Sequence, residues 1–125
     1  MDIKINYLEE DSIVLVKVTG IMDFEKHKTY AKEILSFAKE HNSHKIFVNM
    51  LDMIPRVTTL EIEDFPKTLI ECGAKPEHRI AILHNPPPPY DRGFSHFINV
   101  AFLKSLKIKP FTNKDMAHAW LKSEP

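Results

Sequence analysis

Residues 46–51 read Ile46-Phe47-Val48-Asn49-Met50-Leu51, a short apolar run that directly follows a polar segment, residues 42–45. A run of this length and composition is typical of a strand buried on both faces inside a parallel sheet. Residues 79–83 read Arg79-Ile80-Ala81-Ile82-Leu83 and have the same character. Amphipathic segments flank both runs, so the sequence predicts strand-helix-strand units with right-handed crossovers.

The residues before this central run predict a hairpin and a crossover helix. Two apolar segments between Ile3 and Val18 are separated by the polar residues 9–12, which predicts two antiparallel strands. Gly20 is expected to end the second strand. Asp23 then provides a side-chain cap for a helix that should run to about residue 40, because apolar side chains recur there every three or four residues.

The residues after the central run predict a second helix. Thr58 and Glu61 have the T-x-x-E spacing of a capping box, in which each side chain bonds to the backbone amide of the other residue. Pro66 removes one backbone donor, so we expect it either to kink this helix or to start a new one. Gly73 is expected to close the element.

The last third of the chain predicts two more helices around a short strand. Apolar spacing between Phe94 and Leu106 indicates the first helix, and residues 108–111 form a short edge strand. Thr112 and Asp115 form a weaker capping pair for the final helix. We therefore predict one α/β domain over residues 1–125, with element order ββαβαβαβα. Its mixed sheet should have four to five strands, an N-terminal antiparallel hairpin and about four helices.

The composition restricts the environment and the partners of the chain. Seventeen basic and seventeen acidic residues balance, so no strong overall field draws the chain to nucleic acid or to anionic lipid. Cys72 is the single cysteine and cannot form an internal disulfide, which suits the reducing cytoplasm. The alternating N-terminus is unlike a signal peptide, and we expect no integral membrane segment. The sequence leaves the oligomeric state open, a homodimer included.

Four segments together resemble the STAS domain, specifically its SpoIIAA-like bacterial branch. Their order and spacing, rather than any single motif, carry this likeness over nearly the whole chain. The segments are Val18-x-Gly20 with Asp23-Phe24, residues 46–50, residues 79–82, and Phe111-Thr112-Asn113 with residues 117–121. The resemblance implies a non-enzymatic regulatory module that binds a partner protein, as the bacterial anti-sigma-factor antagonists do. The lipid-binding CRAL-TRIO domains are neighbours of this fold.

The resemblance also implies a place for a phosphorylation site. In the antagonists a phosphorylated serine follows the central strand, after an aspartate and beside a glycine. Here Asp52 fits this pattern, but no serine or glycine follows it before the next helix. Thr58 and Thr59 are the candidate equivalents, and Thr58 is also explained as a helix cap.

A second hypothesis comes from the residues that follow the parallel strands. Ligands of open α/β sheets bind outside the carboxyl ends of the strands, and here these ends are apolar. We predict that they form a mouth for a small apolar, lipid-like ligand, with His84, Asn85, Asp52 and Arg56 as polar contacts; the alternative is that they only cover the core. The predicted mouth residues are Met22, Met53, Ile54, His84, Tyr90, Phe94 and Phe97.

No motif for catalysis, a metal or a cofactor is recognisable. His41 and His44 are the closest histidine pair, but no cysteine or carboxylate motif completes a metal site. Ser95 and His96 are neighbours on a helix and point about 100° apart, so they are poorly placed to share a proton. The residues therefore predict no enzyme and no cofactor. The run Pro86–Pro89 is expected to be a stiff connection, or less readily a polyproline ligand.

Overall fold

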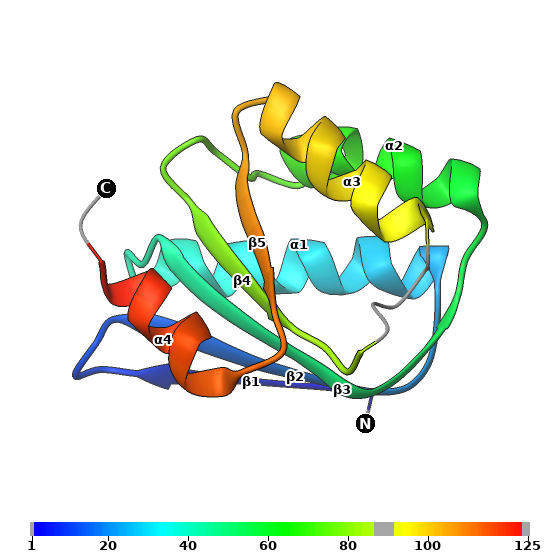
Figure 1. Ribbon diagram of the computed structural model, residues 1–125. Helices are drawn as coiled ribbons and strands as arrows, with labels where there is room; N and C mark the ends of the chain where they lie inside the picture. Colours follow the sequence, from blue (N-terminus) through cyan, green and yellow to red (C-terminus); the bar gives the residue numbers. More distant parts are fainter. Residues whose placement is uncertain (1, 87–91, 124–125) are drawn as a thin grey trace.

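The computed structural model describes residues 2–86 and 92–123, which form five strands and four helices (Figure 1). In chain order, the elements are β1 (Ile3–Leu8), β2 (Ile13–Asp23), α1 (Phe24–Glu40), β3 (Lys45–Arg56), α2 (Thr59–Glu71), β4 (Arg79–Leu83), α3 (Arg92–Leu103), β5 (Lys107–Phe111) and α4 (Lys114–Lys122). None of the helices in these ranges is long and apolar enough to cross a membrane.

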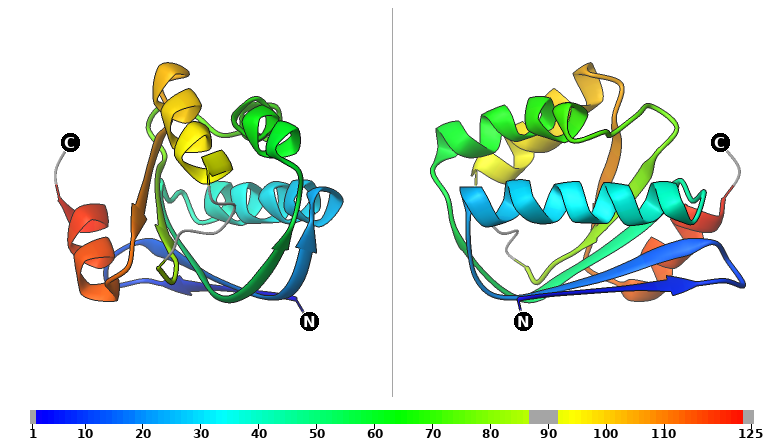
Figure 2. Two further views of the ribbon diagram at one scale, coloured as in Figure 1. Left: turned by 45° about the vertical axis from the view of Figure 1, so that its right-hand side comes forward. Right: turned by 180° about the vertical axis from the view of Figure 1, so that it is seen from behind.

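The strands form one mixed sheet in the order β1-β2-β3-β4-β5. β1 pairs antiparallel with β2, and every later pair is parallel. Helices α1, α2 and α3 lie on one face of the curved sheet, whereas α4 lies on the opposite face (Figure 2). The predicted fold class, with its N-terminal hairpin, mixed sheet and four helices, is confirmed.

Each face of the sheet has its own hydrophobic core, because successive side chains of a strand point to opposite faces. On β3, Ile46 and Val48 face the three helices, and Phe47 between them faces α4. The larger core contains side chains from all five strands together with α1, α2 and α3. The smaller core is closed by Ala117 and Leu121, which are both fully buried.

β2 and β3 are longer than the sequence pattern predicted. Gly20 does not end β2: it adopts a positive φ of 80° and the strand continues to Asp23. A bulge between Lys17 and Thr19 shifts the register just before it. The backbone groups of β2 and β3 pair with each other along this extension, up to the pair Asp23 and Arg56. β3 therefore also continues past residue 51 and ends at Arg56. The apolar pattern misses this extension because part of it faces solvent.

The helix boundaries decide between the two alternatives for Pro66 and correct the expected cap of α4. α2 is a single helix with Pro66 inside it, so the proline does not begin a new element. α4 is capped by Asn113 rather than by Thr112: the Asn113 side chain accepts a hydrogen bond from the backbone N–H of Met116 at 3.0 Å. Both residue types can cap a helix, and the extended backbone at Asn113 decides the position.

Arg79, at the start of β4, fastens α4 to the sheet. Its guanidinium donates to the backbone oxygen of Trp120 at 2.6 Å and to Ser123 Oγ at 2.9 Å. The same group lies 4.5 Å from the centre of the Trp120 ring, a cation–π distance. α4 is therefore held by one charged side chain in addition to its apolar face.

Candidate functional site

A cavity of about 90 Å³ lies between the sheet and helices α1, α2 and α3. Its lining residues are apolar apart from His27 and Tyr30. Strands β2, β3, β4 and β5 line one side of the cavity, and the three helices line the other side. The lining residues are Val18, Met22, Phe24, His27, Tyr30, Ala31, Ile34, Leu35, Ile46, Val48, Met50, Ile62, Phe65, Leu69, Ile80, Ile82, Phe94, Phe97 and Ile108.

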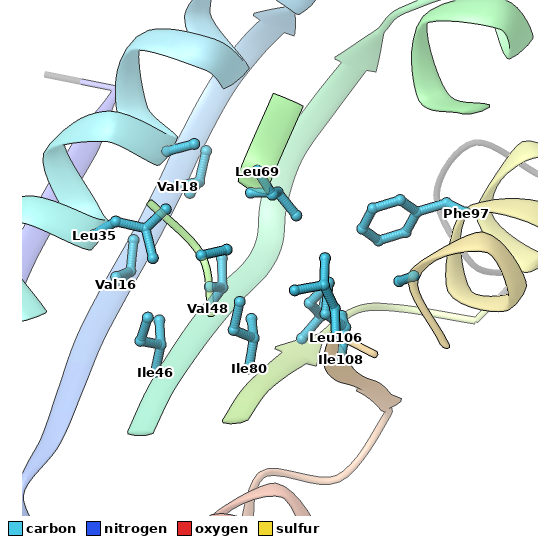
Figure 3. Packing of buried hydrophobic residues seen from close by; sticks show 14 of the residues in the cluster. Val16, Val18, Leu35, Ile46, Val48, Leu69, Ile80, Phe97, Leu106 and Ile108 are labelled. Atoms are coloured by element: carbon cyan, nitrogen blue, oxygen red, sulfur yellow. The ribbon is translucent and has the colours of Figure 1, made fainter. Parts of the chain in front are cut away.

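The alternation of the strands explains why the cavity is apolar. Val18, Val48 and Ile82 occupy the helix-facing positions of three adjacent strands, and all three are buried. Figure 3 shows such strand side chains pointing toward the same interior space as Leu35 of α1 and Phe97 of α3. Because β-branched residues are stiff, space left between them and the helices is not easily filled by a change of rotamer.

His27 is the basic side chain among the residues that line the cavity. Its ring lies 5.6 Å from the Phe65 ring in an edge-on arrangement, where α1 faces α2. Burial lowers the pKa of His27 to about 4, although the carboxylates of Asp23 and Glu61 act in the opposite direction. The imidazole is therefore neutral at pH 7, and the cavity wall carries no charge there.

The structure brings three of the predicted mouth residues to this cavity. Met22, Phe94 and Phe97 line it and are buried. His84 is also buried and lies behind the wall: its ring is 5.3 Å from that of Phe94, and its Nδ1 is 3.0 Å from the carbonyl oxygen of Asn85. Met53 is buried within the same core without lining the cavity.

The other predicted mouth residues are placed differently. Ile54 is 58% exposed and faces away from the cavity walls. Tyr90 and the prolines 87–89 lie outside the described residues. The predicted polar contacts bond elsewhere, since Asn85 Nδ2 donates to the carbonyl oxygen of Leu51 at 2.8 Å and Asp52 pairs with Lys17 at 3.5 Å.

Sequence reasoning missed the contribution of α1. Phe24, His27, Ala31 and Ile34 follow one another at helical spacing and line the cavity together, but an apolar stripe of this kind usually marks ordinary core packing. The available signal was His27 itself. A histidine within the apolar stripe of a helix, with charged residues on the other faces, indicates that this stripe does more than pack against the hydrophobic core.

Thr58 and Thr59 lie at the start of α2, away from the cavity walls. The Thr58 hydroxyl accepts from the backbone N–H of Glu61 at 3.1 Å, and the Glu61 carboxylate accepts from the backbone N–H of Thr58 at 2.8 Å. This is the reciprocal capping box that the sequence predicted. Both threonines are exposed, so a modifying enzyme could reach them.

Replacing Thr58 by alanine removes the hydroxyl acceptor and should lower the free energy of unfolding by about 1 kcal/mol. Urea denaturation followed by circular dichroism measures this change. Thr58→Ser, which keeps the hydroxyl, is the matched control and should stay within a few tenths of a kcal/mol of the parent protein. Equal losses for both variants would contradict the capping role.

The histidines do not gather into a metal site. His44 and His78 are neighbours, with ring centres 5.7 Å apart, and His78 Nδ1 accepts from the backbone N–H of Lys75 at 2.8 Å. Burial and the nearby His44 lower the pKa of His78. His41 instead stacks on Phe37. In residues 2–86 and 92–123, no group of three or more histidine, cysteine or carboxylate side chains could hold a metal ion.

Comparison with known proteins supports the fold. The sequence matches no protein-family profile and no curated protein. The structure is similar to the crystal structure of an uncharacterized protein of the DUF3478 family from Shewanella loihica PV-4, which is described as having a SpoIIAA-like fold. The TM-score is 0.58 at 17% identity, over 95% of this chain and 91% of that one. The chain thus has a SpoIIAA-like fold, and the resemblance seen in the sequence is confirmed at the level of fold.

Proposed function

We propose that this protein binds a small apolar molecule in the cavity beneath α1, α2 and α3. The observation that carries the proposal is a cavity whose lining residues are apolar except for His27 and Tyr30. Ligand sites combine apolar walls with a few polar groups that orient the ligand, and His27 and Tyr30 are such groups. Neither binding nor release requires a catalytic residue, so the proposed role is not enzymatic. We assign this role to the cytoplasm, where the single cysteine would stay reduced.

The cavity volume restricts the ligand. An engineered apolar cavity of about 150 Å³ in another protein binds benzene or xenon. At about 90 Å³, this cavity is smaller, so it accepts a xenon atom or a compact group of a few carbon atoms. A whole lipid tail does not fit unless the helices separate. The ligand is therefore a small apolar molecule, or one short apolar branch of a larger molecule.

Xenon binding followed by methyl NMR tests the proposal. Xenon should shift the methyl signals of Val48, Leu69 and Ile82, which line the cavity, and leave the exposed Leu103 methyl signals in place. Benzene should produce the same pattern if the helices yield slightly. The absence of any shift localised to the cavity walls would overturn the proposed site.

Ala31→Met is the variant that fills the cavity. Ala31 is buried on α1 and lines the cavity, so a methionine side chain enters the empty space and should abolish the xenon shifts. Filling real space should leave stability unchanged or raise it, whereas overpacking a filled core costs about 1–3 kcal/mol. Ala119→Met on the exposed surface of α4 is the matched control and should keep the xenon response.

The second candidate function is a STAS-type regulatory module that binds a partner protein. One observation favours it: Ile21 and Ile54 pair across the β2–β3 extension and are 41% and 58% exposed, and Ile54 comes four residues before Thr58. Leu60, in the first turn of α2, is 76% exposed. A partner that covers these side chains would also sense a phosphate on Thr58 or Thr59, whose charge suits a helix N-terminus.

A further inference from the structure

We propose that the corner formed by the C-terminal end of α3 docks on an anionic lipid surface. Phe102 and Leu103 end this helix and are 78% and 79% exposed, the highest values among the large apolar side chains in the described residues. Lys104 follows them directly and is also exposed. An exposed aromatic and an exposed aliphatic side chain beside a lysine match the chemistry of a membrane interface, where apolar groups enter the boundary and lysines meet headgroups.

The neighbouring helix adds a third apolar side chain. α2 and α3 both connect parallel strands, so they run in the same direction, and His96 Nε2 lies 3.9 Å from Glu63 Oε1 across their contact. About two helical turns beyond this pair, the two helices carry Ile70 and Leu103. Ile70 is 43% exposed, so α2 adds a third exposed apolar side chain at the end of the helix pair where Phe102 and Leu103 lie, and Leu60 lies apart from this group at the other end of α2.

The charge around this corner is positive, although the chain as a whole is neutral. Residues 102–111, from the end of α3 through β5, contain three lysines and no acidic residue. Lys45, Arg79 and Lys107 are in register at the starts of three adjacent strands, which places a row of cations at this end of the sheet, with the Arg79 guanidinium turned to Trp120 of α4.

The acidic residues near this edge do not cancel the row. Glu40 at the end of α1, Glu71 at the end of α2 and Glu77 in the α2–β4 connection offset part of the charge. The acidic β1–β2 turn, residues 9–11, lies at the same edge but beside β2, three strand spacings from β5. That separation is about 14 Å, which exceeds the Debye length of about 8 Å at physiological ionic strength.

The size of the apolar group favours a lipid surface over a protein. A stable protein interface buries about 800 Å² on each partner, and a single buried aromatic side chain accounts for about 150–250 Å². Two protruding residues at a corner, with Ile70 beside them, do not supply such an area. They do supply an anchor whose strength depends on the surrounding lysines, and which is separate from the cavity proposed above.

Vesicle flotation tests the proposal. The full chain should float with phosphatidylcholine vesicles that contain about 30% phosphatidylserine, but not with pure phosphatidylcholine, and high salt should weaken the binding. Phe102→Ser with Leu103→Ser should abolish flotation. Lys104→Gln with Lys107→Gln should weaken it about tenfold or more.

Leu60→Ser is the matched control, because Leu60 is 76% exposed but lies at the opposite end of the α2–α3 pair. It should float like the parent protein, and circular dichroism should show that all variants are folded. Equal binding to neutral vesicles, or flotation unaffected by the Phe102 and Leu103 substitutions, would overturn the proposal. The proposal would also be overturned if the parent protein did not float with any vesicles. This includes the case in which the Phe102 and Leu103 substitutions change only the oligomeric state.

Discussion

Leu121→Ala is expected to lower the free energy of unfolding by about 2–5 kcal/mol, a large part of the stability of a domain of this size. Leu121 is fully buried, and with Ala117 it forms the apolar face by which α4 covers its side of the sheet. Truncation leaves a cavity over Phe47 and Leu83, which belong to the same small core. That core has few other residues that could move in to fill it.

Chemical denaturation measures this loss of unfolding free energy directly. The cooperativity of the transition shows whether α4 unfolds together with the sheet and the other three helices. Leu60→Ala is the control, because Leu60 is exposed and its truncation should change stability by less than about 0.5 kcal/mol. A loss below about 1 kcal/mol for Leu121→Ala would mean that α4 is only loosely attached and that the smaller core contributes little.

Acid should destabilise the protein through His27. Its pKa is about 4 in the folded chain and about 6.5 when unfolded, so the unfolded state takes up a proton first as the pH falls. The stability contribution of neutral His27 is therefore complete above pH 6.5 and declines between pH 6.5 and about 4. The decline reaches about 3 kcal/mol in total, at up to about 1.4 kcal/mol for each pH unit.

His27→Leu isolates this effect. The variant should lose much less stability than the parent protein between pH 7 and pH 4, and the difference between the two curves gives the contribution of His27. His78 and His118 also have lowered pKa values, and they remain in both proteins. His96→Gln is the control, because the His96 side chain is 52% exposed. If the curves of parent and His27→Leu are parallel, His27 is not held neutral by burial.

The fold could be predicted largely because each strand and helix carries its own local signal. Alternation in residues 3–8, the apolar run 46–51 and the T-x-x-E spacing at Thr58 each depend only on near neighbours. The errors occur where a distant partner decides the outcome. β2 continues through Gly20 because β3 pairs with it as far as Arg56, and no pattern within either segment indicates that pairing.

The candidate site was predictable only in part, for a related reason. Met22, Phe94 and Phe97 were found because topology places the residues after parallel strands at one edge of the sheet. Whether apolar residues leave space between them depends on how tightly the helices approach, which the sequence does not report. α1 forms much of the wall, and only His27 within its apolar face set that face apart from ordinary core.

The position of α4 also matters while the chain is being synthesised. Residues 3–111 contain all five strands and the three helices of the opposite face, and they leave the ribosome before α4 does. At that stage nothing yet shields Ile13, Phe47 and Leu83 from water. Until α4 packs against the sheet, this apolar surface is exposed to chaperones and to other nascent chains. Docking of α4 covers the surface and removes this risk of aggregation.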